Sequence, residues 1–382
     1  MAGGYTGKYC IVDLSRATTE VVEPDEAFYR KYLGGYGLGA AVIMERQKPG
    51  TAPLSPEAHL GFCSGLLTGS GALFSGRFTV VGKSPLTGGW GDANAGGYLS
   101  REIKRAGYDA VFFTGAAPAF AIECYENGIL DASAAGGLKL GWGKSPEIIR
   151  LTEMIIKREG LGDILADGVK RAAQKIGRGA DRFAMHAGGQ ELPMHDPRLD
   201  PGFAIAYQCE PTPGRHSISS YMYTDLYGVK KLFPRAKQMI SGAKGKVSKK
   251  IQGYTAGSFY VQLVNCAGMC FFGAITSTLP LVDWLNAATG WDLPPDAYFK
   301  TGERILNLRK AFNLREGVKP EDHKLSDRAL GKTPLASGPL KGVRVDMDGL
   351  MQEFYRTVGW DPTTGGPTPA KMTELEIDVP VS

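Results

Sequence analysis

The sequence lacks long apolar runs and a leader segment. None of its apolar stretches reaches the ~18 residues of a membrane helix, and the longest, residues 259–275, is interrupted by Gln262 and Asn265. The first residues show no charged segment followed by an apolar one, as a secretory signal peptide requires. We therefore expect a cytoplasmic protein without a membrane span.

Cysteine and histidine are scarce and scattered. Only Cys266 and Cys270 lie close together among the six cysteines, and no two of the five histidines stand at a zinc-binding spacing. Without a secretory signal, this pattern argues against a disulfide framework and predicts reduced thiols. Conventional hydrolase sites and zinc sites built from protein ligands therefore have little support.

The composition is that of a globular chain with an excess of glycine. Hydrophobic residues form 43% and charged residues 22% of the 382 positions, which excludes a disordered chain. The net charge, 44 − 39 = +5, is too mild to indicate nucleic acid. Glycine fills 52 positions, nearly twice its average share of ~7%. This excess predicts tight turns and close backbone approaches, for example to a cofactor.

The order of the patterns predicts an α+β fold. A β-rich N-terminal domain is expected over residues 1–117 and a mainly α-helical domain over 118–382, in line with the two or three domains that this length predicts. The strands expected in the first domain are residues 9–14, 19–22, 77–81 and 110–114, and its short helices are residues 25–33 and 97–106.

Helix boundaries are readable in the second half. Ser145-Pro146 predicts a helix start and Gly160 its end, and Asp163 is expected to cap the next helix. A later helix is expected to end at Gly317.

Three glycine-containing stretches resemble nucleotide-binding loops without meeting their requirements. Residues 137–145 and 71–77 depart from the P-loop pattern in spacing or in the residues after the last glycine. Gly35, Gly37 and Gly39 are expected between two helical stretches, so the strand that a dinucleotide fingerprint needs is missing. We interpret all three as loop and cap glycines.

Residues 75–88 and 92–98 place two cations and an amide among glycines. Glycine lets backbone N–H groups approach a ligand closely, and arginine binds phosphate bidentately, so Arg77, Lys83 and Asn94 suit a phosphate-bearing cofactor. On these residues alone, a set of β-turns with Arg77 on a solvated strand remains the more common arrangement.

Two further motifs have alternative interpretations. Residues 264–272 hold Cys266 and Cys270 four positions apart, on one face if the segment is helical, and the alternative is a buried helix with inert thiols. Residues 192–198 and 213–216 gather polar groups in loops, and the alternative is a surface turn with an Asp–Arg pair.

Taken in order, these motifs strongly resemble the tungsten-dependent aldehyde ferredoxin oxidoreductase family. The resemblance covers nearly the whole chain. It is carried by residues 33–35, 53–57, 65–69, 76–77, 83–88, 93–97, 107–110, 157–160, 163–168, 196–198, 265–270, 285–288, 290–291 and 302–305.

The resemblance implies a tungsten or molybdenum ion held by the dithiolene sulfurs of two pyranopterins. It implies oxidation of an aldehyde to a carboxylic acid, with electrons passing through a 4Fe-4S cluster to ferredoxin. Cys270 matches the last cluster ligand, and Asn265 replaces an acidic residue that accepts hydrogen bonds from the pterin. The residues expected on the cofactor side are Arg77, Lys83, Asn94, Gly96, Asn265, Gly268 and Met269.

A large internal stretch of the family pattern is absent between about Gly115 and Ala119. The missing stretch holds the second half of the β domain, most of the middle helical domain, the other cluster cysteines and the proposed catalytic glutamate. The family's partner histidine aligns near Phe203, which leaves His195 and His216 as the nearest titratable candidates. A truncated sheet is expected to have an open edge and an uncovered apolar face.

Residues 230–250 form a basic segment within the second half of the chain. No Asp or Glu occurs from Leu226 to Val282, and eight cations fall within residues 230–250. This segment is either a solvated face, or a docking patch for an acidic partner such as ferredoxin, or a site for an anionic substrate tail such as coenzyme A. Nucleic acid is disfavoured because aromatic residues do not interleave with the cations.

Three hypotheses follow from the sequence. The first is an oxidoreductase of the tungstopterin family. The second is a non-catalytic or partner-completed subunit of an oxidoreductase complex, in a homo- or hetero-oligomer. The third is an internally deleted gene.

Overall fold

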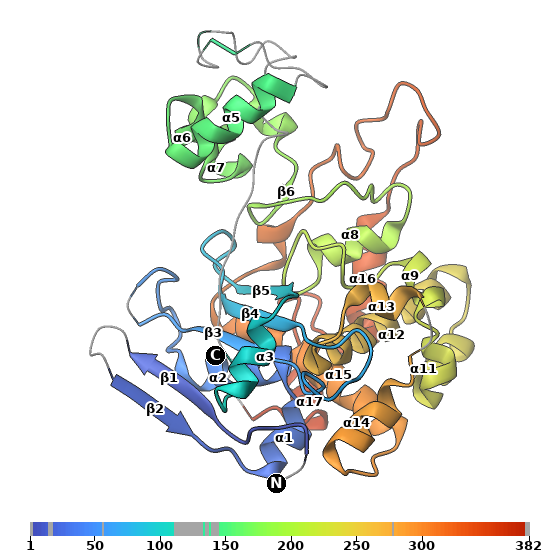
Figure 1. The fold of residues 1–382 in the computed structure, drawn as a ribbon. Coiled ribbons are helices and arrows are strands. Elements are labelled where there is room, and N and C mark those ends of the chain that lie inside the picture. Colours follow the sequence, from blue (N-terminus) through green and yellow to red (C-terminus); the bar gives the residue numbers. More distant parts are fainter. Residues whose placement is uncertain are drawn as a thin grey trace.

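The computed structural model describes residues 3–13, 18–55, 57–110, 133, 137–138, 145–276 and 279–378. Longer strands come first and helices follow, so the predicted α+β fold is confirmed (Figure 1). The strands are β1 (Tyr9–Asp13), β2 (Thr18–Val22), β3 (Leu60–Ser64), β4 (Phe78–Lys83), β5 (Trp90–Ala95), β6 (His186–Ala187) and β7 (Gln190–Glu191).

Helices form most of the remainder. They are α1 (Glu26–Tyr32), α2 (Gly35–Arg46), α3 (Leu99–Arg105), α5 (Ser145–Lys157), α6 (Leu161–Leu165), α7 (Val169–Ile176), α8 (Pro201–Gln208), α9 (Tyr221–Leu226), α10 (Val229–Leu232), α11 (Pro234–Gly242), α12 (Lys246–Ala267), α13 (Phe271–Thr276), α14 (Leu281–Thr289), α15 (Pro295–Arg315), α16 (Met347–Val358) and α17 (Pro369–Glu374), with 3-10 turns η1 (Ala180–Phe183) and η2 (Pro320–His323). Among the described residues, no helix is both long and apolar enough to cross a membrane.

The central sheet is a small antiparallel meander. Strand β4 lies between β3 and β5, and the register pairs Thr79 with Asn94 and Phe78 with Ala95. This register brings the residue before β4, Arg77, close to the end of β5. The predicted strand pair near the N-terminus is also confirmed, as the antiparallel ribbon of β1 and β2. Most of the strand expected over 110–114 lies outside the described residues.

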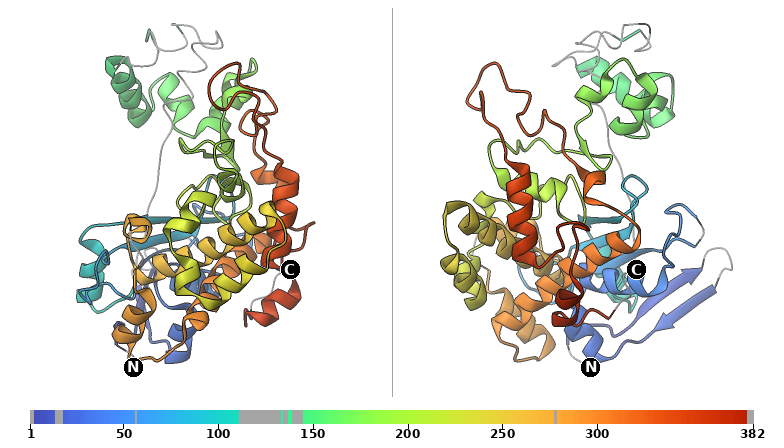
Figure 2. Two further views of the ribbon diagram at one scale, coloured as in Figure 1. Left: turned by 90° about the vertical axis from the view of Figure 1, so that its right-hand side faces the viewer. Right: turned by 180° about the vertical axis from the view of Figure 1, so that it is seen from behind.

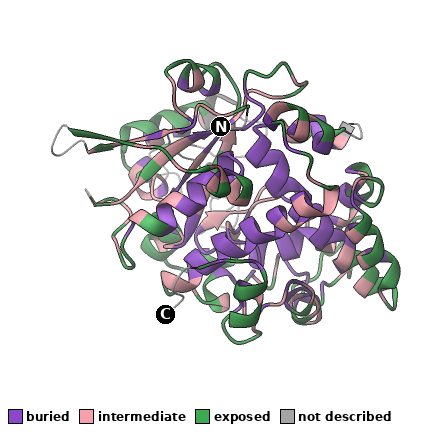
Figure 3. Ribbon diagram, turned by 90° about the horizontal axis from the view of Figure 1, so that it is seen from below, coloured by how far each residue is buried: buried purple, intermediate pink, exposed green. Residues whose placement is uncertain are grey.

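Helix α12 is the centre of the helical part. It packs against α2, α9, α11, α15 and α16, and its side chains from Gly253 to Ala267 are all buried. A helix that is buried all round must lie in the interior. Buried residues accordingly gather where the helices converge (Figure 3). The core joins residues of α2 and β4 to residues of α12 and α15, so the N-terminal strands share one hydrophobic core with the helices.

The glycines at positions 35, 37 and 39 lie inside helix α2, not between two helical stretches as expected. A Cβ at Gly35 would overlap the backbone carbonyl of Asn265, and a Cβ at Gly39 would press on Val81 and Cys63. Glycine therefore lets α2 approach both α12 and the sheet closely, which is a packing role.

Helices α5 to α7 form a second, smaller hydrophobic cluster apart from the main body (Figure 2). The predicted helix start at Ser145 is confirmed. The prediction that Asp163 caps the following helix is wrong, because α6 already begins at Leu161 and Asp163 lies within it. Its carboxylate instead pairs with Arg158 at 3.1 Å.

Candidate functional site

A cavity of about 580 Å³ opens beside the end of the central sheet. Its walls come from the loop that precedes β4, the turn after β5, the start of α3 and the residue Cys270. Gly69, Gly71, Gly76 and Gly97 line it with φ between +84° and +112°, and a Cβ built on any of them would meet no atom within 4 Å. These glycines leave backbone exposed to the cavity, which suits close contact with a ligand.

Two hydrogen bonds join Arg77, on the cavity wall, to Asn94. The Nε of Arg77 donates to Oδ1 of Asn94, and its Nη2 donates to the Asn94 carbonyl at 3.1 Å. The backbone N–H of Arg77 donates to the Gly268 carbonyl at 2.9 Å, which ties the start of β4 to the end of α12. A Cβ at Gly268 would crowd the backbone of Arg77 and Gly65, so glycine is needed at this contact.

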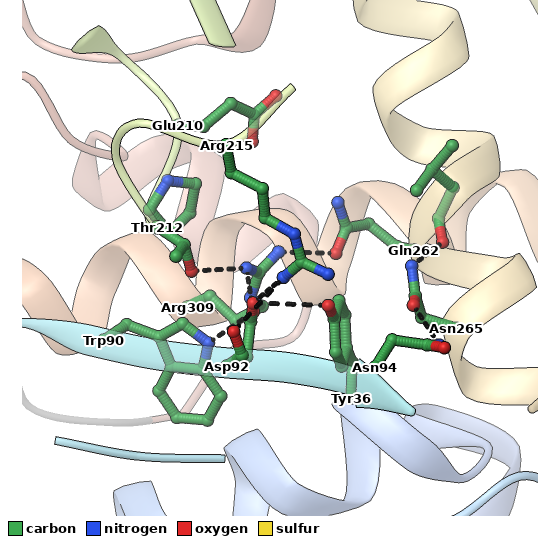
Figure 4. Close-up of polar contacts among 12 residues, drawn as sticks. Tyr36, Trp90, Asp92, Asn94, Glu210, Thr212, Arg215, Gln262, Asn265 and Arg309 are labelled. Carbon is green, nitrogen blue, oxygen red and sulfur yellow. Dashed lines mark hydrogen bonds and ion pairs between the residues drawn. The ribbon is translucent and has the colours of Figure 1, made fainter. Parts of the chain in front are cut away.

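Asn265 continues the chain of hydrogen bonds. Its Oδ1 accepts from Nδ2 of Asn94 at 2.7 Å, and its own Nδ2 donates to the Val261 carbonyl at 2.8 Å (Figure 4). Asn265 is buried and does not line the cavity. Its amide thus holds Asn94, and Asn94 in turn holds the Arg77 guanidinium at the cavity wall.

Cys266 and Cys270 do not share a helical face, contrary to the expectation. Helix α12 ends at Ala267, because Gly268 adopts the left-handed conformation with φ of +74°. Cys270 lies beyond this break on the cavity wall, where its Sγ is 3.7 Å from Nη1 of Arg77. Cys266 points into the core and accepts from the Gly37 N–H at 3.3 Å, and burial raises the pKa of its thiol to about 12.

Two other residues expected on the cofactor side lie elsewhere. Lys83, at the far end of β4, forms a 2.6 Å ion pair with the buried carboxylate of Glu316. Met269 is fully buried in the core. By contrast, Gly96 lines the cavity, and a Cβ there would sit 3.2 Å from Nη1 of Arg77.

The two candidate histidines stack on each other. The rings of His195 and His216 are 4.3 Å apart, and His195 also contacts Phe203 at 5.2 Å. Burial lowers the pKa of His216, and His195 and Arg215 lower it further. His195 thus contacts Phe203, the position where the resemblance places the family histidine, and His216 stacks on His195, but neither histidine lines the described cavity.

A buried charge cluster adjoins the site. Asp92 and Arg215 lie in motifs that are recognised in the sequence, but their pairing with each other and with Arg309 was not predicted. Asp92 lies two residues before Asn94 on β5, so both side chains face the same way. Its carboxylate pairs with Arg215 and with Arg309, and it accepts hydrogen bonds from Tyr36 at 3.2 Å and from the Trp90 indole at 2.9 Å (Figure 4).

Electrostatics keep this carboxylate charged. Burial by itself would raise the pKa of Asp92, but Arg309 and Arg215 outweigh it and the pKa is lowered. Arg309 also donates to Gln262 at 2.7 Å and to Thr212 at 3.1 Å. The nearby Glu210 accepts from Tyr254 and Ser258, and burial raises its pKa. The cluster therefore fixes β5, α12 and α15 against one another directly behind Asn94.

Comparison with solved structures shows the same fold in a known assembly. The active-site complex BamBC of benzoyl coenzyme A reductase, solved with 1,5-dienoyl-CoA, matches with a TM-score of 0.77. The match covers 99% of this chain and 98% of that chain at 17% sequence identity.

Comparison with curated sequences identifies relatives. The tungsten-containing aldehyde ferredoxin oxidoreductase of Pyrococcus furiosus is 35% identical over 270 residues, which cover 69% of this chain and 42% of the relative. The enzyme of the same name from Pyrococcus horikoshii is 34% identical over 267 residues. A third relative is the aliphatic sulfonate oxidoreductase, WOR-like subunit, of P. furiosus. It is 28% identical over 293 residues, and the match again covers 42% of the relative.

The chain thus spans about 42% of the length of these relatives. A family model described as aldehyde ferredoxin oxidoreductase, domains 2 & 3, matches residues 66–377. The match includes the cavity wall from Thr68 to Cys270 and most of the helical part. This chain therefore belongs to the aldehyde ferredoxin oxidoreductase family.

Proposed function

We propose that this chain binds a tungsten or molybdenum bis-pyranopterin in the glycine-lined cavity and acts in the oxidation of an aldehyde to a carboxylic acid. The observation that carries the proposal is the meeting of Arg77 and Cys270 at a cavity of about 580 Å³, where Asn94 holds the Arg77 guanidinium by hydrogen bonds. Relatives that are named tungsten-containing enzymes support the choice of metal.

The residues of the cavity fit a phosphate-bearing pterin. Arg77 presents a guanidinium whose orientation Asn94 fixes, and Arg101 adds a second cation to the lining. Gly76 and Gly97 leave room for a ligand against the backbone. When bound, the metallated pterin would supply the two-electron exchange with the substrate, while the chain's own residues bind and orient it.

The thiols in the described part of the chain do not fit a 4Fe-4S cluster. Such a cluster takes four ligands, normally thiolates, and of the five described cysteines only Cys270 lines the cavity. Cys124 lies outside the described residues. Cys270 stays the proposed cluster ligand, and we assign no electron path from the cavity to ferredoxin through this chain.

The test is the cofactor content of the full-length chain. It is expressed anaerobically with tungstate or molybdate, and metal is measured by mass spectrometry alongside fluorescent pterin oxidation products. We expect metal and pterin at a ratio of about 1:2 in the wild type and a strong loss of both in Arg77→Gln. Arg105→Gln, an exposed arginine on α3 that pairs with Glu102, serves as the control and should leave the content unchanged.

Absence of tungsten, molybdenum and pterin from the wild type would reject a self-sufficient cofactor site. Equal losses in Arg77→Gln and Arg105→Gln would show that the cavity is not where the cofactor binds.

A second candidate is a subunit that a partner chain completes. It is favoured by large apolar side chains that stay exposed around the cavity: Tyr98 is 78% exposed, Phe272 69% and Phe74 47%. Exposed apolar groups clustered around a polar cavity are typical of a surface that another chain covers. Purification from the native host tests this candidate, since a metal-loaded chain that elutes as a lone monomer contradicts it.

A further inference from the structure

A second pocket lies between α9 and the first turns of α12, in the basic segment. Its volume of about 500 Å³ falls within the range of small-molecule sites. Four of the seven lysines between positions 230 and 250 line it: Lys230, Lys246, Lys249 and Lys250. The remaining three, Lys231, Lys237 and Lys244, lie outside the lining.

Helix geometry explains why the lysines gather. Lys246, Lys249 and Lys250 stand three and four positions apart and therefore lie on one face of α12. Gly253 continues this face, and a Cβ there would come within 3.0 Å of Thr224. Because Gly253 has no side chain, α9 lies close against α12 and closes one side of the pocket.

The positive charge of the pocket is only partly neutralised. Asp225 pairs with Lys230 at 3.6 Å, and Lys250 sits 4.8 Å above the Tyr221 ring. Asp200, the other acidic residue of the lining, accepts the backbone N–H groups of Gly202, Tyr221 and Met222 at 2.8 to 3.2 Å.

Lys246 and Lys249 remain available to an anion. Among the described residues, neither ammonium group has an ion-pair or hydrogen-bond partner, and both side chains are exposed. With four lysines against two carboxylates, the lining carries a net charge of 4 − 2 = +2. Two neighbouring free ammonium groups supply the positive charge that attracts a doubly charged phosphate or diphosphate.

The other wall of the pocket is apolar. Ile240 is buried beneath it, while Leu199 and Met222 are exposed, Met222 by 55%. Tyr221 adds an aromatic ring next to them. A ligand that matches both walls must be anionic at one end and apolar or aromatic at the other.

We propose that this pocket binds a phosphorylated small molecule with an apolar or aromatic part, the phosphate on Lys246 and Lys249 and the other part against Tyr221 and Met222. An acidic protein partner is the competing occupant. The pocket's volume of about 500 Å³ and its lining of lysines on one side and apolar side chains on the other favour a small molecule, because small-molecule sites combine an apolar wall with a few placed polar groups. The proposal stands independently of the cofactor cavity.

The pocket is close to that cavity through the helices. Helix α9 packs against α13, and the rings of Tyr223 and Phe271 are 5.3 Å apart. Phe271 follows Cys270, which lines the cofactor cavity. The packed helices α9 and α13 therefore connect the lysine pocket to the wall of the cofactor cavity.

Calorimetric titration of the full-length chain tests the proposal, with ADP as the probe. Adenosine and inorganic phosphate, each lacking one half of the expected recognition, should bind at least about tenfold more weakly than ADP. The double variant Lys246→Ala/Lys249→Ala should lose about tenfold or more in ADP affinity. The control Lys237→Ala/Lys244→Ala removes the same charge from the same segment outside the pocket and should stay within about twofold.

Met222→Ser tests the apolar wall. It should lower the affinity for ADP and leave the affinity for inorganic diphosphate unchanged. Thermal melts of each variant verify that the exposed substitutions leave the fold intact. If both double lysine variants lose ADP affinity equally, binding depends on general surface charge and not on the pocket, and the proposal is overturned. Failure of ADP to bind, together with a ferredoxin that binds through Lys246 and Lys249, would assign the surface to a protein partner instead.

Discussion

The side-chain amide of Asn94 on strand β5 donates a 2.7 Å hydrogen bond to Oδ1 of Asn265 on helix α12. Asn265 is buried and does not line the cavity, so its amide oxygen accepts from Asn94 within the protein. Because Asn94 also receives the Arg77 Nε–H, this one contact links the core helix to the cavity wall.

Replacing Asn265 by leucine should destabilise the protein by about 1–3 kcal/mol. The change removes the acceptor for the Asn94 amide at a buried position and leaves that donor without its partner. Urea unfolding followed by circular dichroism measures the effect. A double-mutant cycle with Asn94→Ala isolates the contact, and strictly additive losses would contradict the role assigned to it.

Replacing Asp92 by asparagine should lower the free energy of unfolding by more than the Asn265 substitution does, by about 3–5 kcal/mol. The substitution leaves the buried guanidinium groups of Arg215 and Arg309 without their counter-charge. Glu102→Gln is the control, since its ion pairs with Arg101 and Arg105 lie at the surface and are worth less than about 1 kcal/mol. If the two variants unfold at similar urea concentrations, the buried cluster is not a structural anchor.

These two contacts also mark what the sequence could and could not predict. The β1–β2 pair, the start of α5 and the end of α15 were predictable, because capping residues and glycines act on their immediate neighbours. The Asp92 cluster was not, because its partners lie 123 and 217 positions away along the chain. Asp92 and Arg215 lie in polar motifs that are visible in the sequence, but nothing in their local sequence pairs them with each other or with Arg309 of α15.

The end of α12 shows the same limit on a smaller scale. Residues 264–272 are apolar enough to continue as one helix, and a single glycine does not by itself end a helix. Gly268 does so here because its backbone contacts Gly65 and Arg77, which come from a distant loop. The cavity position of Cys270 therefore depends on tertiary packing that periodicity alone cannot reveal.

Acidification should destabilise the protein through His323. Burial and the charge of Lys310 lower the pKa of this histidine to about 3 from 6.5. The unfolded chain therefore binds a proton below about pH 6.5 that the folded chain does not bind until about pH 3. Stability falls across that interval, by about 5 kcal/mol in total.

His323→Gln should flatten this part of the pH profile, as measured by urea midpoints between pH 7 and pH 4. An unchanged slope in His323→Gln would assign the acid sensitivity to other groups.

Thiol labelling distinguishes Cys270 from the core cysteines. Cys270 is partly exposed on the cavity wall, whereas Cys209 and Cys266 are buried, and burial raises the pKa of both thiols to about 12. Because alkylation requires a thiolate that the reagent can reach, N-ethylmaleimide should modify Cys270 in the native protein at least about a hundredfold faster than the two buried cysteines. Peptide mass spectrometry over time gives the rates, and urea should make them converge. Rapid native labelling of Cys266 would mean that α2 separates from α12 in solution, and the cavity wall that these helices support would not be the rigid platform that a bound cofactor requires.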